Sequence, residues 1–171
     1  LTVIVVYVLI LIGGIVRSTG AGMGCPDWPK CFGSWVPPTE ASQLPANYQE
    51  VFGAKLKGEV EFNAFKTWTE YLNRLFGAFT GLVIFGTLLA SIAFYKRDRP
   101  IFYMSLLAFL LVGFEGWLGS KVVSTELAPI LVTLHMLLAV VIVFILLYVM
   151  ARSYVGHISV EEINRKSFIN K

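Results

Sequence analysis

The chain has 171 residues, of which 56% are hydrophobic and only 15% are charged, and its formal net charge is +3. Soluble domains carry far more charge, so this composition excludes a soluble globular protein and indicates an integral membrane protein. The excess of positive charge does not require a nucleic-acid partner, because basic loops are the usual topological signal of a membrane chain.

Four apolar runs can be read as membrane-spanning helices. A helix needs about 20 apolar residues to cross a hydrocarbon core of about 30 Å. The sequence therefore predicts an all-α, four-transmembrane-helix bundle with a 1–151 membrane domain, an outer loop at 17–67 and a cytoplasmic tail at 152–171. The predicted helices cover residues 1–16, 68–95, 101–122 and 129–150. The first run begins without a methionine, so we expect its natural start to be missing.

The positions of the basic residues predict the orientation. The connection at 96–99 is short and basic, and further Arg and Lys residues follow the last run. Short loops rich in Lys and Arg stay in the cytoplasm. We therefore expect a multi-pass protein with both ends inside and the 17–67 loop on the periplasmic or external side.

Both cysteines of the chain, Cys25 and Cys31, fall in the predicted outer loop. An oxidising compartment allows them to form a disulfide, and Pro26 and Pro29 suit a tightly turned connection. A metal pair is the alternative, but this loop has no histidine and lacks the CxxC spacing of a zinc site. We predict a disulfide.

Polar residues open the second apolar run, where Thr69, Glu70, Asn73 and Arg74 follow one another closely. Ionisable groups are costly inside a membrane, so they usually mark a functional site with partners on neighbouring helices. Glu70, Asn73 and Arg74 stand at positions i, i+3 and i+4 and share one helix face. This face is the first candidate for a site.

Two further ionisable residues each have two interpretations. Arg17, at the end of the first run, is either an anchor that reaches to the membrane surface or the partner of an acidic ligand group. Glu115, in the third run, is either protonated and hydrogen-bonded or part of a proton path, and we favour the first.

His135 is the only histidine inside an apolar run. At 1.5 Å per helical residue, it and Asn73 reach nearly the same depth below the outer surface, as two groups facing each other across a haem plane do. Neutral imidazole is a common ligand of haem iron in helix bundles. The alternative is a hydrogen-bonded interior histidine without a ligand.

These features resemble the haem A synthase family, membrane enzymes that convert haem O to haem A for cytochrome oxidase. Family members usually consist of two similar four-helix halves, and this chain resembles the N-terminal one. The resemblance covers almost the whole chain up to residue 150. It is carried by the segments GGIVRSTG at 13–20, CPDWP at 25–29, EYLNRL at 70–75 and GWLG at 116–119, and by the pattern around His135.

The resemblance implies a haem site between the second and fourth predicted helices. It implies His135 as axial ligand of the haem iron, Glu70 as a catalytic residue near the haem edge, and a Cys25–Cys31 pair. Haem O and haem A are then substrate and product, and haem b is a further candidate cofactor. Asn73 falls in the second ligand position, and Arg17 and Arg74 are candidate partners of the haem propionates. The implied location is the bacterial cytoplasmic (inner) membrane, in contact with lipid.

Two departures from the family pattern leave the function open. The family has a histidine where this chain has Asn73, and a second four-helix half is absent. The chain is therefore either a fragment or a half-size protein that acts as a homo-oligomer or with a second four-helix half. We expect a haem A synthase-like oxidoreductase; the alternative is a non-catalytic four-helix subunit, a haem-binding or assembly module associated with respiratory complexes.

Overall fold

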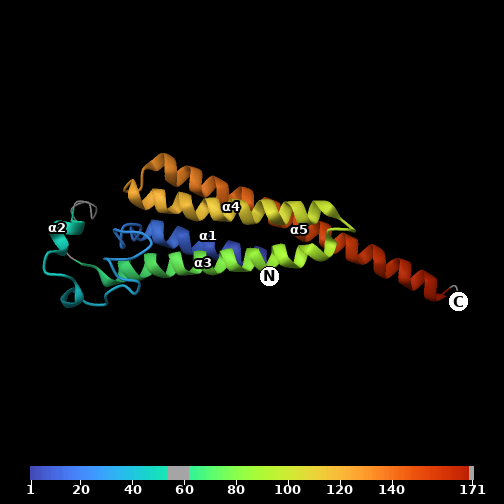
Figure 1. Ribbon diagram of the computed structural model, residues 1–171, viewed down its shortest axis with the longest axis horizontal. Helices are drawn as coiled ribbons and strands as arrows, with labels where there is room; N and C mark the ends of the chain where they lie inside the picture. The colour runs from blue at the N-terminus through green and yellow to red at the C-terminus, as the bar shows by residue number, and fades with distance from the viewer. Residues whose placement is uncertain (54–61, 170–171) are drawn as a thin grey trace.

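The computed structural model describes residues 1–53 and 62–169, and their side chains up to residue 155. Within these ranges the chain is helical and contains no β-strand, so the predicted all-α class is confirmed. Four long helices lie side by side, and the loop that follows the first helix projects from one end of them (Figure 1). The elements are α1 (Thr2–Ser18), η1 (Ala41–Gln43), α2 (Tyr48–Phe52), α3 (Ala64–Ser91), η2 (Ile92–Phe94), α4 (Arg99–Ser124) and α5 (Pro129–Ile169).

Three of the described helices are long and apolar enough to cross a membrane. Their candidate spans are Ala64–Phe94, Arg99–Ser124 and Pro129–Val155. Helix α1 is also apolar, but its 17 residues extend only about 26 Å at 1.5 Å per residue, which is less than the hydrocarbon core of about 30 Å. The protein is thus a helical membrane protein, and a fourth membrane crossing by α1 remains a prediction.

Helix α5 is longer than the sequence suggested. It was expected to end near residue 150, yet the helix continues to Ile169. Arg, Glu and Lys are good helix formers, so a helix need not stop where its apolar run stops. His157, expected beyond the last helix, therefore lies within α5, about 33 Å along the axis from His135 at 1.5 Å per residue. A cytoplasmic tail at 152–171 remains a prediction, and residues 170–171 lie outside the described part.

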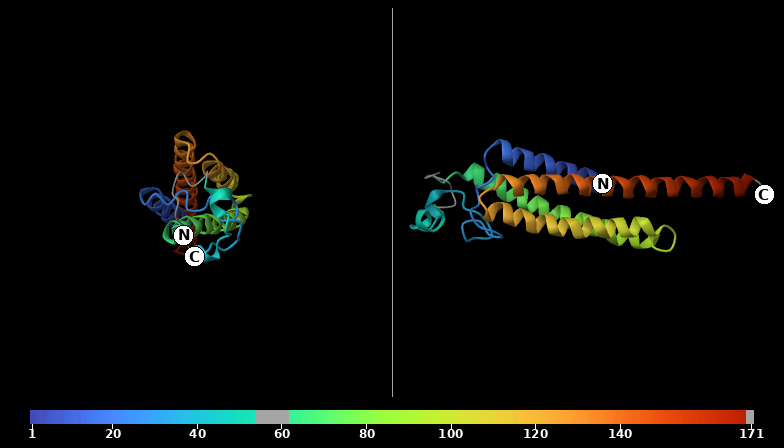
Figure 2. Two further views of the ribbon diagram at one scale, coloured as in Figure 1. Left: turned by 90° about the vertical axis from the view of Figure 1, so that its left-hand side faces the viewer. Right: turned by 90° about the horizontal axis from the view of Figure 1, so that it is seen from above.

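The four long helices form a ring. Helix α1 packs against α3 and α5, and α4 packs against the same two helices. Among the described residues no set of contacts joins α3 to α5, so these two helices stand diagonally across the bundle. The end-on view in Figure 2 shows the same arrangement. The two helices that carry Asn73 and His135 therefore face each other across the bundle.

The apolar core lies mainly in the half of the bundle that is remote from the loop. All four long helices contribute to it, and Figure 1 shows the α4–α5 hairpin diverging from the α1–α3 pair toward the loop end. The half near the loop therefore depends on other contacts. The buried core residues are Val6, Ile84, Ala108, Ile142, Val143 and Leu146.

The loop docks on the first turns of α3. The Thr67 hydroxyl donates a hydrogen bond to the Gly24 carbonyl at 2.9 Å, and the Trp68 indole N–H donates to the Pro38 carbonyl at 3.2 Å. A Cβ atom at Gly24 would overlap the Lys66 carbonyl oxygen and lie 2.7 Å from the Thr67 nitrogen. Only glycine therefore lets the loop backbone approach α3 this closely.

This close approach gives a stability prediction. Gly24→Ala should destabilise the protein by about 1–3 kcal/mol, because the methyl group meets backbone that cannot move aside. Gly14→Ala is the matched control, since a Cβ there meets no atom within 4 Å and alanine favours a helix over glycine by up to about 1 kcal/mol. Unfolding of the purified protein in detergent measures both. Equal stability of Gly24→Ala and the wild type would contradict the docking.

Candidate functional site

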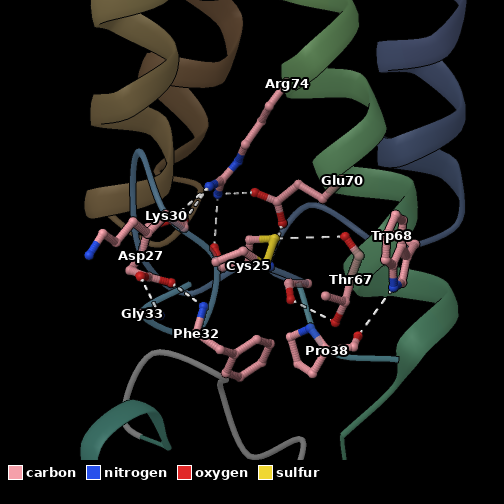
Figure 3. The surroundings of a disulfide bond; sticks show 12 residues. Cys25, Asp27, Lys30, Phe32, Gly33, Pro38, Thr67, Trp68, Glu70 and Arg74 are labelled. Carbon is pink, nitrogen blue, oxygen red and sulfur yellow. Dashed lines mark hydrogen bonds and ion pairs between the residues drawn. A yellow bond between two sulfur atoms is a disulfide. The ribbon is translucent and has the colours of Figure 1, made fainter. Parts of the chain in front are cut away.

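Glu70 on α3 is turned toward the loop and is almost fully buried, with 4% of its surface exposed. Its Oε2 accepts a hydrogen bond from the Cys25 backbone N–H at 2.9 Å, and its Oε1 pairs with the Arg74 guanidinium. Figure 3 shows the carboxylate between the disulfide loop and Arg74. Both oxygens of Glu70 thus have partners, as burial of a carboxylate requires.

Arg74 donates hydrogen bonds to several backbone carbonyl groups of the loop. Its guanidinium donates to the carbonyl oxygens of Cys25 at 2.9 Å, Asp27 at 2.7 Å and Lys30 at 3.1 Å, in addition to Glu70. Arginine suits this position because its planar group carries five N–H donors in a fixed fork. We call these contacts of Glu70 and Arg74 with the loop backbone the Glu70–Arg74 clamp.

The clamp surrounds a disulfide. The structure joins Cys25 and Cys31, and both residues are buried. Within the same loop, the Asp27 carboxylate accepts hydrogen bonds from the backbone N–H groups of Phe32 and Gly33 at 2.6 and 2.9 Å. The disulfide, Asp27 and the clamp together hold this short loop segment against the loop end of α3.

Asn73 does not join the clamp, although it shares a helix face with Glu70 and Arg74 by spacing. A Cβ atom at Gly13 would lie 3.9 Å from Asn73 Oδ1, so the amide faces α1. This oxygen is buried and has no hydrogen-bond partner within the described part of the chain. Of the three residues on the predicted face, Glu70 and Arg74 contact the loop, whereas Asn73 faces α1.

His135 lies against α4 rather than alone in the bundle. Its Nδ1 is 3.2 Å from Glu115 Oε1, and its Cε1 would lie 3.4 Å from a Cβ atom at Gly119. The Glu115 side chain is 12% exposed, whereas that of His135 is 38% exposed. This pair is not evident from the spacing of polar residues within either apolar run, because its members lie on different helices. The hairpin could have revealed it, since Glu115 lies nine positions before the end of α4 and His135 six positions after the start of α5.

Arg17 also extends toward α5, where its Nη1 donates to the Met136 sulfur at 3.1 Å. A thioether is a weak acceptor, so this contact leaves most of the guanidinium's hydrogen-bonding capacity unused. Arg74, by contrast, already holds three carbonyl groups and a carboxylate. Of the two candidate propionate partners, Arg17 is therefore the better placed to take a ligand.

Buried polar atoms without a partner gather in the loop half of the bundle. Buried polar groups are normally hydrogen-bonded, so such atoms call for a ligand or bound water. Within the described residues no three His, Cys, Asp or Glu side chains are grouped as a metal site would need. The unpartnered atoms are Asn73 Oδ1, Arg74 Nε, Glu115 Oε1, Glu115 Oε2 and His135 Nδ1.

An apolar groove of about 560 Å³ lies elsewhere, between α1 and α3. None of the candidate residues lines it, and its apolar walls suit lipid chains. The groove is therefore not part of the candidate site. Its lining residues are Ile12, Leu72, Leu75, Phe76, Ala78, Phe79 and Leu82.

The clamp gives a prediction about the disulfide. Arg74→Lys should increase the rate at which a soluble reductant opens the Cys25–Cys31 bond by at least about tenfold, since each charge-assisted hydrogen bond contributes roughly 1.5–3 kcal/mol and an ammonium cannot hold all four acceptors. Thiol labelling after timed reduction measures the rate. Arg152→Lys is the control, because Arg152 bonds Asp98, the residue that precedes α4, and takes no part in the clamp. An unchanged rate in Arg74→Lys would contradict the clamp.

Comparison with known proteins relates these features to a family. A family model described as "Cytochrome oxidase assembly protein", COX15-CtaA, matches residues 1–169. The chain is 30% identical over 154 residues to a haem A synthase of Shewanella oneidensis, a match that covers 89% of this chain and 44% of the relative. No solved structure matches the chain.

Two other haem A synthases give a similar result. That of Bartonella bacilliformis is 32% identical over 130 residues, covering 71% of this chain and 35% of the relative. That of Rickettsia felis is 30% identical over 165 residues, covering 85% and 46%. The chain thus spans less than half the length of these relatives. The resemblance seen in the sequence motifs is confirmed, and the chain belongs to the COX15-CtaA family of cytochrome oxidase assembly proteins.

Proposed function

We propose that this chain forms a haem-binding four-helix unit of the haem A synthase type, which takes part in oxidising a methyl group of haem O to the formyl group of haem A. The observation that carries the proposal is Asn73 Oδ1 on α3, a buried polar atom without a hydrogen-bond partner in the described part of the chain, in the same half of the bundle as His135 on the diagonal helix α5. The apolar core is concentrated in the other half, so the loop half is the part that a ligand would complete.

His135 is the proposed axial ligand. Bound haem would supply the iron and the methyl group that is oxidised. Asn73 stands on the diagonal helix α3, and an amide is a poor ligand for haem iron, so this chain by itself leaves the second axial position weakly occupied or open. Arg17, whose described contact is a weak one, is the proposed partner of a haem propionate.

Glu70 is the proposed catalytic residue, acting as a base or proton relay. In the structure its Oε2 is bonded to the neutral Cys25 N–H, whereas its Oε1 pairs with charged Arg74. A carboxylate oxygen that faces a neutral donor is held less strongly than one that faces a cation, because only the second bond joins two opposite charges. We infer that Oε2 is the oxygen that can be released to take a proton, while Arg74 keeps the carboxylate in place.

A second function is favoured by two specific observations. Both oxygens of Glu70 are engaged in holding the loop, and Asn73 stands where the family resemblance implies a histidine. These features suit a non-catalytic, haem-binding or assembly subunit associated with respiratory complexes. Under either function we place the chain in the bacterial cytoplasmic membrane, with the loop outside, as a homo-oligomer or together with a second four-helix half.

An absorption spectrum of the purified chain with added haem tests the proposal. We expect a high-spin or weakly ligated haem, because only one histidine can reach the iron. His135→Ala should abolish haem retention, and Asn73→His should shift the spectrum toward low spin. His157→Ala is the matched control, since His157 is the only other histidine and should leave the spectrum unchanged.

Two outcomes would contradict this assignment. Equal haem content in His135→Ala and the wild type would mean that His135 only forms contacts within the bundle. A wild-type spectrum of low-spin, bis-histidine haem would mean that another copy or another subunit supplies the second ligand.

The enzyme and the subunit can be separated in cells that produce haem O but lack haem A synthase. Expression of the chain together with the C-terminal half of a related enzyme should yield haem A, and Glu70→Gln should lower the yield about 10²–10⁴-fold, the usual contribution of a general acid or base. Arg74→Lys controls for loosening of the clamp, because it retains the carboxylate. Bound haem without any haem A would favour the subunit.

A further inference from the structure

The contact between α4 and α5 contains a feature that the proposed function leaves unused. The His135 ring packs against α4, with Nδ1 3.2 Å from Glu115 Oε1 and Cε1 beside Gly119. Glu115 and Gly119 are four positions apart and therefore lie on one face of α4. One residue offers a carboxyl oxygen, and the other leaves room for the ring.

A small residue at position 119 leaves room for the ring. A Cβ atom at this position would lie 3.4 Å from His135 Cε1, at the limit of ordinary van der Waals contact. A larger side chain would push the ring away from α4 and away from Glu115. The absence of a side chain at Gly119 and the carboxyl group at Glu115 thus place the same edge of the imidazole against α4.

The two groups are within reach but not aligned. Nδ1 of His135 and both oxygens of Glu115 are buried, and none of them has a hydrogen-bond partner within the described part of the protein. A small rotation of the ring or the carboxyl group would join them. Hydrogen bonds in ligand sites are often poorly aligned without the ligand and tighten when it binds.

A histidine that binds a metal through one ring nitrogen usually donates the N–H of the other to a carboxylate or a carbonyl oxygen. That second bond fixes the tautomer and the direction of the ring. We propose that Glu115 is a positioning residue of the haem site: it accepts the Nδ1–H of His135 and thereby leaves the Nε2 lone pair for the haem iron. The inference rests on the proposed function, in which His135 is the ligand.

If the role of Glu115 is purely structural, different results are expected. If Glu115 and His135 only pack together in the α4–α5 hairpin, without a hydrogen bond between them, replacing Glu115 lowers stability but leaves the His135 tautomer and the haem affinity unchanged. Haem affinity and the tautomer of His135 therefore distinguish positioning from packing.

The test uses the purified chain in lipid nanodiscs, labelled with ¹⁵N-histidine in a His157→Gln background so that one histidine is observed. NMR before haem addition reads the His135 tautomer, and haem titration reads the affinity. The variants are Glu115→Gln, which retains an acceptor oxygen, and Glu115→Leu, which does not. Ser120→Ala is the control on α4, because among the described residues its hydroxyl bonds within the helix, to the Trp117 carbonyl.

We expect His135 to carry its proton on Nδ1 in the wild type, in Ser120→Ala and in Glu115→Gln. Glu115→Leu should lose this preference and bind haem roughly 10–100-fold more weakly, the usual effect of removing such a partner. Glu115→Gln should restore most of the affinity, which excludes a general packing defect.

The failures are distinguishable. If the wild type binds haem through His135 but Glu115→Leu changes neither the tautomer nor the affinity, the positioning role is wrong and the proposed function stands. If the wild type binds no haem, the proposed function fails and the inference fails with it.

Discussion

A guanidinium group within a membrane-spanning helix needs partners for its charge, and the contacts that the two terminal nitrogens of Arg74 make organise the loop end of the protein. Its N–H groups draw together three loop carbonyls and Glu70, so the loop cannot leave α3 without stranding a charge. An unpaired charge in such surroundings costs several kcal/mol. The disulfide adds a covalent constraint to a segment that this pairing already holds.

The two halves of the bundle differ in how their buried side chains are stabilised. Away from the loop, apolar side chains of all four long helices pack together and leave little polar to satisfy. Near the loop, Asn73, Glu115 and His135 have buried polar atoms without hydrogen-bond partners in the described part of the chain. Asn73 and Arg74 are consecutive, so the anchoring of the loop also fixes the turn of α3 that faces the proposed haem position. The clamp and the candidate ligand site therefore share one turn of α3.

Helix periodicity and apolar length predicted the long helices well, because both depend on local sequence. The pairing of Glu70 with Arg74 could likewise be expected from their i, i+4 spacing, and the structure contains it. The end of α5 could not be read from hydropathy, because polar residues continue a helix as readily as apolar ones.

The tertiary contacts of the site were harder to foresee. Arg74 bonds backbone carbonyls more than forty positions away, and backbone groups carry no sequence signal. The closeness of Glu115 and His135 depends on how α4 and α5 are aligned in their hairpin. The spacing of residues within one helix does not show this alignment. The roles of these residues toward haem remain predictions.

The central claim is that the loop half of the bundle holds haem through a single histidine of this chain. Electron–nuclear double resonance on the ferric haem complex of the ¹⁵N-histidine-labelled protein measures it directly, because only nitrogens bound to the iron couple strongly. The account predicts coupling to one histidine nitrogen, which disappears in His135→Ala. Coupling to no histidine, or coupling that persists in His135→Ala, would contradict it.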